Sequence, residues 1–136
     1  MIDSQTRNEL LRLAAQARER SYSPYSHYSV GAALLTKDGK IYQGCNIENA
    51  SFTPTICAER TAFFKAIYDG ERDFSAIAVI GSGDSPAYPC GVCRQVMAEF
   101  CNSDFEIITS NRDGSEVVTE TLDSMLLHRF GPKDLQ

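Results

Sequence analysis

Three cysteines and one glutamate are the residues of this sequence best placed to do chemistry. Cys57 and Glu59 lie two positions apart in "TICAER", and Cys90 and Cys93 lie three positions apart in "PCGVCRQ". Residues i and i+3 of a helix share a face, so Cys90 and Cys93 should point the same way. Three thiolates with a fourth position left for water are typical of a catalytic zinc site. The spacing therefore predicts a Zn²⁺ centre on Cys57, Cys90 and Cys93.

Glu59 and the two other cysteines, Cys45 and Cys101, have other expected roles. Residues i and i+2 of a helix do not face each other, so Glu59 should exchange protons with water at the open position and not bind the ion. Cys101 lies about two turns beyond Cys93, too far for the same ion, and Cys45 is expected to be a small buried side chain. A structural zinc site and a redox CxxC pair remain as alternatives to the catalytic centre.

Composition limits the class of protein. The chain has 136 residues, 43% of them hydrophobic and 23% charged, with a net charge of −5, which is expected of a single globular domain over residues 1–136. The acidic balance and the absence of a basic run argue against nucleic acid as a partner. No apolar run reaches membrane-spanning length and no signal peptide is evident, so a cytoplasmic protein without membrane association is expected. The number of cysteines is five, which is odd, and no signal peptide is evident, so a disulfide framework is not expected.

Hydrophobic periodicity predicts nine elements. Helices are expected at 4–20, 57–70, 90–101 and 122–130, and strands at 30–36, 41–47, 74–82, 105–111 and 116–120. This order predicts an α/β domain with a five-stranded sheet and helices on its faces. Thr6 and Glu9 have the spacing of a capping box. The Asp38–Gly39 pair predicts a tight hairpin turn in which both residues have positive φ.

The two cysteine stretches, together with "YSPYSHYSVGAALL" and "GCNIENAS", resemble the zinc-dependent cytidine deaminase superfamily, and within it the short homotetrameric deaminases of free nucleosides. The resemblance runs from about residue 5 to Leu135. It implies a three-layer α-β-α sandwich around a mixed five-stranded sheet. The implied reaction, part of pyrimidine salvage, converts cytidine to uridine and 2′-deoxycytidine to 2′-deoxyuridine, with release of ammonia. One Zn²⁺ per subunit would be held by the three cysteines, and Glu59 would move protons between water, ring N3 and the leaving amine.

The same resemblance implies roles in binding the substrate. Asn46 and Glu48 would hold the ribose hydroxyls, and residues two apart on a strand do share a face. Tyr28 stands where an aromatic ring lines the base pocket, and backbone groups near Ala58 would hold the amide edge of the base. Phe130 would be the aromatic that a neighbouring subunit contributes to the pocket.

One further residue has an implied electrostatic role. Three thiolates leave Zn²⁺ with a net charge of −1, which weakens it as a Lewis acid. The resemblance implies that Arg60 donates hydrogen bonds to the ligand sulfurs and withdraws part of that charge. Three alternative functions stay open: deamination of a modified or antibiotic nucleoside, editing of a polynucleotide, which the acidic charge disfavours, and a non-catalytic zinc-stabilised binding module, which would not need Glu59.

Overall fold

A computed structural model describes residues 1–136. The helices are α1 (Ser4–Arg18), α2 (Ala58–Tyr68), α3 (Gly91–Phe100) and α4 (Leu122–Met125), with a short 3₁₀ helix at Pro132–Leu135. The strands are β1 (Val30–Thr36), β2 (Ile41–Cys45), β3 (Phe74–Gly81), β4 (Glu106–Ser110) and β5 (Val117–Thr121). The predicted order of helices and strands is therefore confirmed. None of the helices combines the length and apolar character that crossing a membrane requires.

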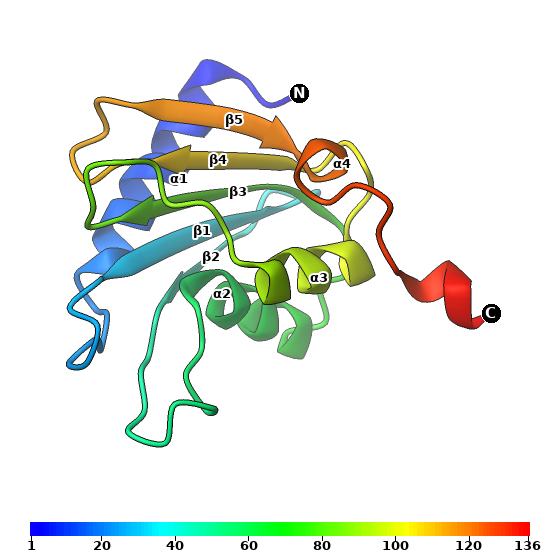
Figure 1. The fold of residues 1–136 in the computed structure, drawn as a ribbon. Helices are drawn as coiled ribbons and strands as arrows, with labels where there is room; N and C mark the ends of the chain where they lie inside the picture. The colour runs from blue at the N-terminus through cyan, green and yellow to red at the C-terminus, as the bar shows by residue number, and fades with distance from the viewer.

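The five strands form one mixed sheet in the order β2-β1-β3-β4-β5. Only β3 and β4 run parallel, and the helix between them, α3, makes the crossover that a parallel pair needs. The other pairs are antiparallel. Helix α1 covers one face of the sheet, and α2 and α3 cover the other (Figure 1). The expected three-layer arrangement is confirmed.

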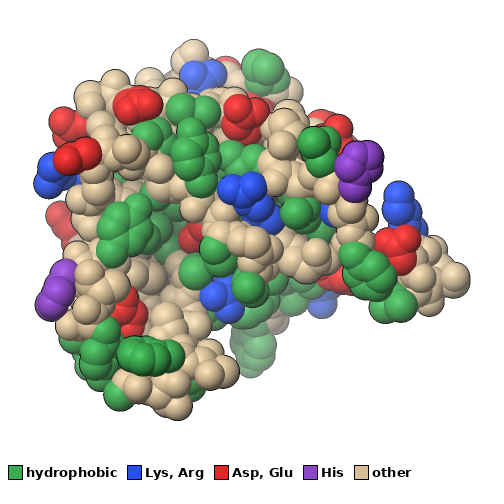
Figure 2. Space-filling view, viewed as in Figure 1, with side chains coloured by type: hydrophobic (Ala, Val, Ile, Leu, Met, Phe, Trp, Pro, Cys, Tyr) green, Lys and Arg blue, Asp and Glu red, His purple; other side chains and the backbone are tan.

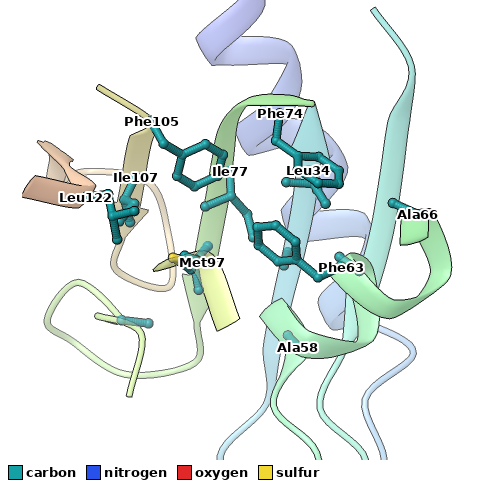
Figure 3. Packing of buried hydrophobic residues seen from close by; sticks show 14 residues of the cluster. Leu34, Ala58, Phe63, Ala66, Phe74, Ile77, Met97, Phe105, Ile107 and Leu122 are labelled. Carbon is teal, nitrogen blue, oxygen red and sulfur yellow. The ribbon is translucent and has the colours of Figure 1, made fainter. Parts of the chain in front are cut away.

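The larger part of the core lies between the sheet and the layer that carries α2 and α3. Phe63 of α2 and Met97 of α3 are fully buried against Ile77 and Ile107 of the central strands (Figure 3). Ala58, the first residue of α2, belongs to the same cluster. Both helices are thus fixed by apolar contacts, and their N-terminal ends take defined positions above the sheet. A second cluster packs α1 against the opposite face.

Two glycines let helices pack directly on strand backbone. A Cβ atom on Gly31 of β1 would lie 2.0 Å from the carbonyl oxygen of Ala14 in α1. A Cβ atom on Gly44 of β2 would lie 2.5 Å from the carbonyl oxygen of Ala58 in α2. No side chain fits at either position, because carbon atoms outside a bond pack at about 3.5–4.0 Å. Gly44 therefore sets how closely the first turn of α2 approaches β2.

The predicted geometry of the first hairpin turn is wrong. Only Gly39 has a positive φ, +94°, whereas Asp38 does not. Thr36 donates its N–H to the carbonyl of Lys40 at 2.9 Å, which leaves a three-residue loop. Such loops need one left-handed residue at their end, and glycine supplies it. Asp38 instead accepts a hydrogen bond from the Thr36 hydroxyl at 2.5 Å.

The ends of several other elements also differ from the predictions. Helix α1 is capped by Asp3, whose Oδ1 accepts from the N–H of Thr6 at 2.8 Å, so the capping box on Thr6 and Glu9 is wrong. Glu9 pairs with Arg12 instead. Strand β2 ends two residues earlier than expected, and α4 has four residues where a helix over 122–130 was expected.

Candidate active site and metal centre

The starts of α2 and α3 bring three sulfur atoms together. Cys57 is the N-cap residue of α2 and Cys90 that of α3, both with extended backbone, and Cys93 lies in the first turn of α3. Their three sulfur atoms all lie within 4.8 Å of one another, and those of Cys57 and Cys90 are 3.8 Å apart. The i, i+3 pair does share a face, although Cys90 precedes the first turn where the sequence placed it inside that turn.

The sulfur group has the dimensions of a zinc site. Thiolates at about 2.3 Å from Zn²⁺ in a tetrahedron are separated by about 3.8 Å. No fourth thiol joins the group: Cys45 donates to the carbonyl of Arg20 at 3.4 Å, and Cys101 follows the C-terminal end of α3. Cys45 is half-buried, less than expected. The donor set therefore fits Zn²⁺ with three protein ligands and a position left for water.

The sulfurs differ in how readily they ionise. Hydrogen bonds from the Cys93 thiol and from Arg60, whose Nη2 lies 3.4 Å from the Cys57 sulfur, lower the pKa of Cys57 to about 5. The same hydrogen bond, with burial, raises the pKa of the Cys93 thiol. Burial acts to lower the pKa of Arg60, but the hydrogen bonds to Cys57 and Cys93 outweigh it and raise the pKa. Arg60 thus contacts the sulfur of Cys57 directly.

Glu59 is a buried acid beside this group. Its side chain lies in the first turn of α2 and the residue is only 4% exposed. Burial, reinforced by the negative charge of Cys57, raises the pKa of Glu59 to about 7. It is not among the three residues whose ligand atoms lie within 4.8 Å of one another. A carboxyl group with this pKa can both take up and release a proton near neutral pH.

A cavity of about 370 Å³ opens in front of Glu59. Its volume is in the range of sites for small molecules. Most of the site residues expected from the sequence line this cavity. They are Tyr28, Asn46, Glu48, Cys57, Ala58, Glu59 and Cys90. Segments far apart in the sequence therefore meet around one small space.

Asn46 follows the last residue of β2 and organises the loop before β1. Its Oδ1 accepts from the backbone N–H of Val30 at 2.9 Å and from the hydroxyl of Ser21. Its Nδ2 donates to the carbonyl of Tyr28 at 2.8 Å. These hydrogen bonds fix residues 21–30 against the end of β2.

Neither Asn46 nor Glu48 lies on β2, which ends at Cys45, whereas the two were expected to share one face of a strand. Ile47, between Asn46 and Glu48, makes isolated bridges to Tyr22 and Ile56, so the backbone stays paired and both polar side chains reach the cavity. Glu48 accepts hydrogen bonds from the hydroxyl and N–H of Ser26 and from a second backbone N–H. The Ser26 hydroxyl is the largest cause that lowers the pKa of Glu48, which keeps the carboxylate ionised.

Two exposed aromatic residues lie outside the cavity of their own chain. Phe130, after α4, is 58% exposed, and its carbonyl accepts from Gln95 Nε2 at 2.9 Å. Phe52 has its ring edge-to-face with Tyr25 at 6.2 Å between ring centroids. Hydrophobic side chains gather over the long loop between β2 and α2, at the lower left of Figure 2. The chain alone thus does not bring Phe130 to the site.

Sequence reasoning missed part of the cavity wall. Val79 of β3, Ala87 and Tyr88 line it, as does Ser26, which also holds Glu48. Tyr88 could have been noticed, because it stands two residues before Cys90. Ser26 gave no signal, since it lies in a Ser/Tyr loop without periodicity.

Known proteins are similar to this chain in both sequence and fold. A family model described as the cytidine and deoxycytidylate deaminase zinc-binding region matches residues 4–109. The cytidine deaminase of Sporosarcina psychrophila is 49% identical over 127 residues, 93% of either chain. The crystal structure of cytidine deaminase from Burkholderia pseudomallei superposes with a TM-score of 0.87 at 45% identity, covering 90% of this chain and 98% of that one.

The mixed sheet flanked by helices, with a cysteine triad and a buried acid at two helix starts, defines a zinc-binding deaminase. The chain belongs to the cytidine and deoxycytidylate deaminase family. A more distant relative, the blasticidin-S deaminase of Bacillus cereus, is 29% identical over 131 residues.

Proposed function

We propose that this protein catalyses the hydrolytic deamination of cytidine to uridine and ammonia, and of 2′-deoxycytidine to 2′-deoxyuridine, in pyrimidine salvage. The observation that carries the proposal is the buried Glu59 beside the sulfur group of Cys57, Cys90 and Cys93, facing a cavity with the polar side chains of Asn46 and Glu48. The relatives with 45–49% identity named as cytidine deaminases support it.

Glu59 moves the protons of the reaction. Zn²⁺ held by the three cysteines would supply a Lewis acid that activates a water molecule. Glu59 takes the first proton that the water gives up and passes it to ring N3 of the base while the water oxygen bonds to C4. It then takes the second proton from that oxygen and gives it to the amino group, as the C4–N bond breaks and ammonia leaves. Its pKa of about 7 suits both directions of transfer. Its burial keeps bulk water from competing for these protons.

The ends of the cavity are suited to a nucleoside. The Glu48 carboxylate, already oriented by Ser26, accepts hydrogen bonds from ribose hydroxyls, and Asn46 lies beside it. The ring of Tyr28 offers an apolar face to the base, and the backbone at Ala58 is placed to hold its amide edge. No Lys or Arg lines the cavity. A neutral nucleoside therefore fits better than a nucleotide, whose phosphate would need a cationic partner.

Arg60 tunes the charge of the sulfur group. Its Nη2 contacts the sulfur of Cys57 at 3.4 Å and it is only partly exposed. A guanidinium in this position reduces the negative charge that three thiolates bring to the metal, so that the metal remains a useful Lewis acid.

We also propose that the domain, residues 1–136, works as a homotetramer in the cytoplasm, without nucleic-acid or membrane partners. The exposure of Phe130 and its absence from the lining of its own cavity support its insertion into a neighbour's cavity. The exposed rings of Phe52 and Tyr25, which pack edge to face, support a subunit contact there. Five free cysteines, three of which must stay reduced to hold metal, support a reducing compartment.

The test is a direct assay with a matched control. Zinc-loaded protein is incubated with cytidine while the ultraviolet change to uridine is followed, and Glu59→Ala is assayed beside it with its zinc content measured. Turnover by the first protein, with none by a variant that still binds zinc, is the expected result. A silent wild-type protein with one zinc per chain would exclude cytidine, and modified nucleosides such as blasticidin S would be tried next.

A further inference from the structure

We propose that Gly81 and Tyr28 act as one positioning unit in the wall of the substrate cavity. The hydroxyl end of Tyr28 occupies the space that a side chain at position 81 would need, so the tyrosine ring keeps its place only because residue 81 is glycine. The consequence for substrate binding rests on the proposed function, whereas the pairing of the two residues does not.

The evidence is the close approach of the two residues. A Cβ atom on Gly81 would lie 2.3 Å from the hydroxyl oxygen and 2.9 Å from the Cζ atom of Tyr28, and 2.8 Å from the Cβ atom of Ala87. All three distances are far shorter than van der Waals contact. Gly81 is not among the residues with positive φ, so its backbone conformation does not itself require glycine. Space for the Tyr28 hydroxyl is therefore the main reason for glycine here.

The strand cannot move back to make room for a side chain. Gly81 is the last residue of β3 and pairs with Val30 of β1 in the centre of the sheet. Its carbonyl accepts a hydrogen bond from Arg18 Nη1 at 2.6 Å. Helix α1 thus holds this end of β3 in place.

The backbone of Tyr28 cannot move back either. Its N–H donates to the Ser26 hydroxyl at 3.0 Å, and its carbonyl accepts from Asn46 Nδ2 at 2.8 Å. The preceding residue, His27, has a φ of +57°, a left-handed conformation that fixes the direction of the chain. A methyl group at position 81 would therefore displace the ring of Tyr28, and the open side available to the ring is the cavity.

The unit explains how the cavity accommodates a tyrosine in its wall. The ring and Ala87 line the cavity together, and Gly81 lies behind them. An aromatic ring without the hydroxyl would tolerate alanine at position 81 better than tyrosine does. The effects of substitutions at positions 28 and 81 on stability and on substrate binding should therefore not be additive.

The experiment is a double-mutant cycle with two independent readouts. The proteins are wild type, Gly81→Ala, Tyr28→Phe and the double variant, each zinc-loaded with its zinc content measured. Gly83→Ala is the control, because its Cβ would meet the Tyr28 ring at the milder distance of 3.3 Å. The first readout is the midpoint of urea denaturation, which needs no substrate. The second is KM and kcat for cytidine.

We expect Gly81→Ala to lower the urea midpoint and to raise KM about tenfold, with a smaller effect on kcat, because a displaced ring obstructs binding. In the Tyr28→Phe background the same substitution should reduce the urea midpoint and raise KM about half as much, with the remaining effect due to the Cζ atom of the ring and to Ala87. Gly83→Ala should change both readouts much less.

Equal losses from Gly81→Ala in the tyrosine and phenylalanine backgrounds would overturn the proposal. Failure of both Gly81→Ala proteins to fold would also overturn it, because contacts other than that with the Tyr28 hydroxyl would then account for the glycine. Folding of the double variant alone would support it. If wild type does not deaminate cytidine but the urea midpoints show the coupling, the proposed function fails and the pairing of Gly81 with Tyr28 stands.

Discussion

Replacing Glu59 by glutamine should stabilise the metal-free protein, and by an amount that depends on pH. Burial raises the pKa of Glu59 from 4.5 to about 7, so the fold favours the neutral acid. At pH 7 and above the folded protein must hold a charge that the unfolded chain holds more easily. The interval between the two pKa values, at 1.36 kcal/mol per pH unit, corresponds to about 3 kcal/mol. Glutamine is neutral at every pH and does not carry this cost.

The sign of the effect follows from the raised pKa. Below pH 4.5 Glu59 is protonated in both the folded and the unfolded states, and its charge contributes no difference between the proteins. As the pH rises from 4.5 to about 7 the wild type loses stability relative to Glu59→Gln, and above that the difference is constant. We therefore expect an advantage of the variant of less than about 1 kcal/mol at pH 5 and about 3 kcal/mol at pH 8.

The assay is urea denaturation of the chelator-treated, reduced proteins at pH 5 and pH 8. With a urea dependence of about 2 kcal/mol per molar, the midpoint of the variant should lie roughly 1.5 M higher at pH 8. Glu99→Gln, on the exposed side of α3, controls for the loss of one negative charge. A Glu59→Gln advantage that is the same at both pH values, or that is absent at pH 8, would refute the argument that a buried charge is the cause.

Three further results are expected. Arg60→Ala should bind one zinc per chain yet deaminate cytidine about tenfold more slowly, because charge on the sulfurs is no longer withdrawn; an unchanged kcat with normal zinc content would contradict this. Gly44→Ala should lower the free energy of unfolding by about 1–3 kcal/mol in urea denaturation, since its Cβ would lie 2.5 Å from the Ala58 carbonyl oxygen, whereas Gly131→Ala, whose Cβ would meet nothing within 4 Å, should change it little. Chelation should abolish turnover while the far-ultraviolet circular dichroism is retained, because the core between the sheet and the helices contains no metal ligand except Cys93; loss of the fold on chelation would favour the structural-module alternative.

The sequence predicted the elements and the metal ligands well because both depend on short-range patterns. Strand β3 is a continuous apolar run and α3 a periodic one, and each is found where that pattern places it. Cys57, Cys90 and Cys93 are identifiable from residue type and spacing alone, and the structure brings their sulfurs together.

The errors lie where the fold decides between locally acceptable arrangements. Both Asp3 and Thr6 can accept the hydrogen bond that caps α1, and the structure uses Asp3, directly before the first helical residue. Asn46 and Glu48 continue the alternation of a strand in the sequence, but the regular ladder of β2 ends at Cys45, and Ile47 pairs with Tyr22 and Ile56 instead. The role of Gly81 depends on Tyr28, 53 residues away, and no local pattern can express such a contact.

The two helices that carry the sulfur group begin without the side chain that usually completes a helix start. Ser, Thr, Asp or Asn at the N-cap accepts a hydrogen bond from the first turn and contributes about 1 kcal/mol. Cys57 and Cys90 occupy these positions and make no such bond. The positive ends of two helix dipoles therefore converge on one cluster of thiolates. Ser, Thr, Asp or Asn at both positions would stabilise the helices but would remove two metal ligands. The two helix starts are therefore less stable than they could be, because their N-cap residues serve to bind a metal.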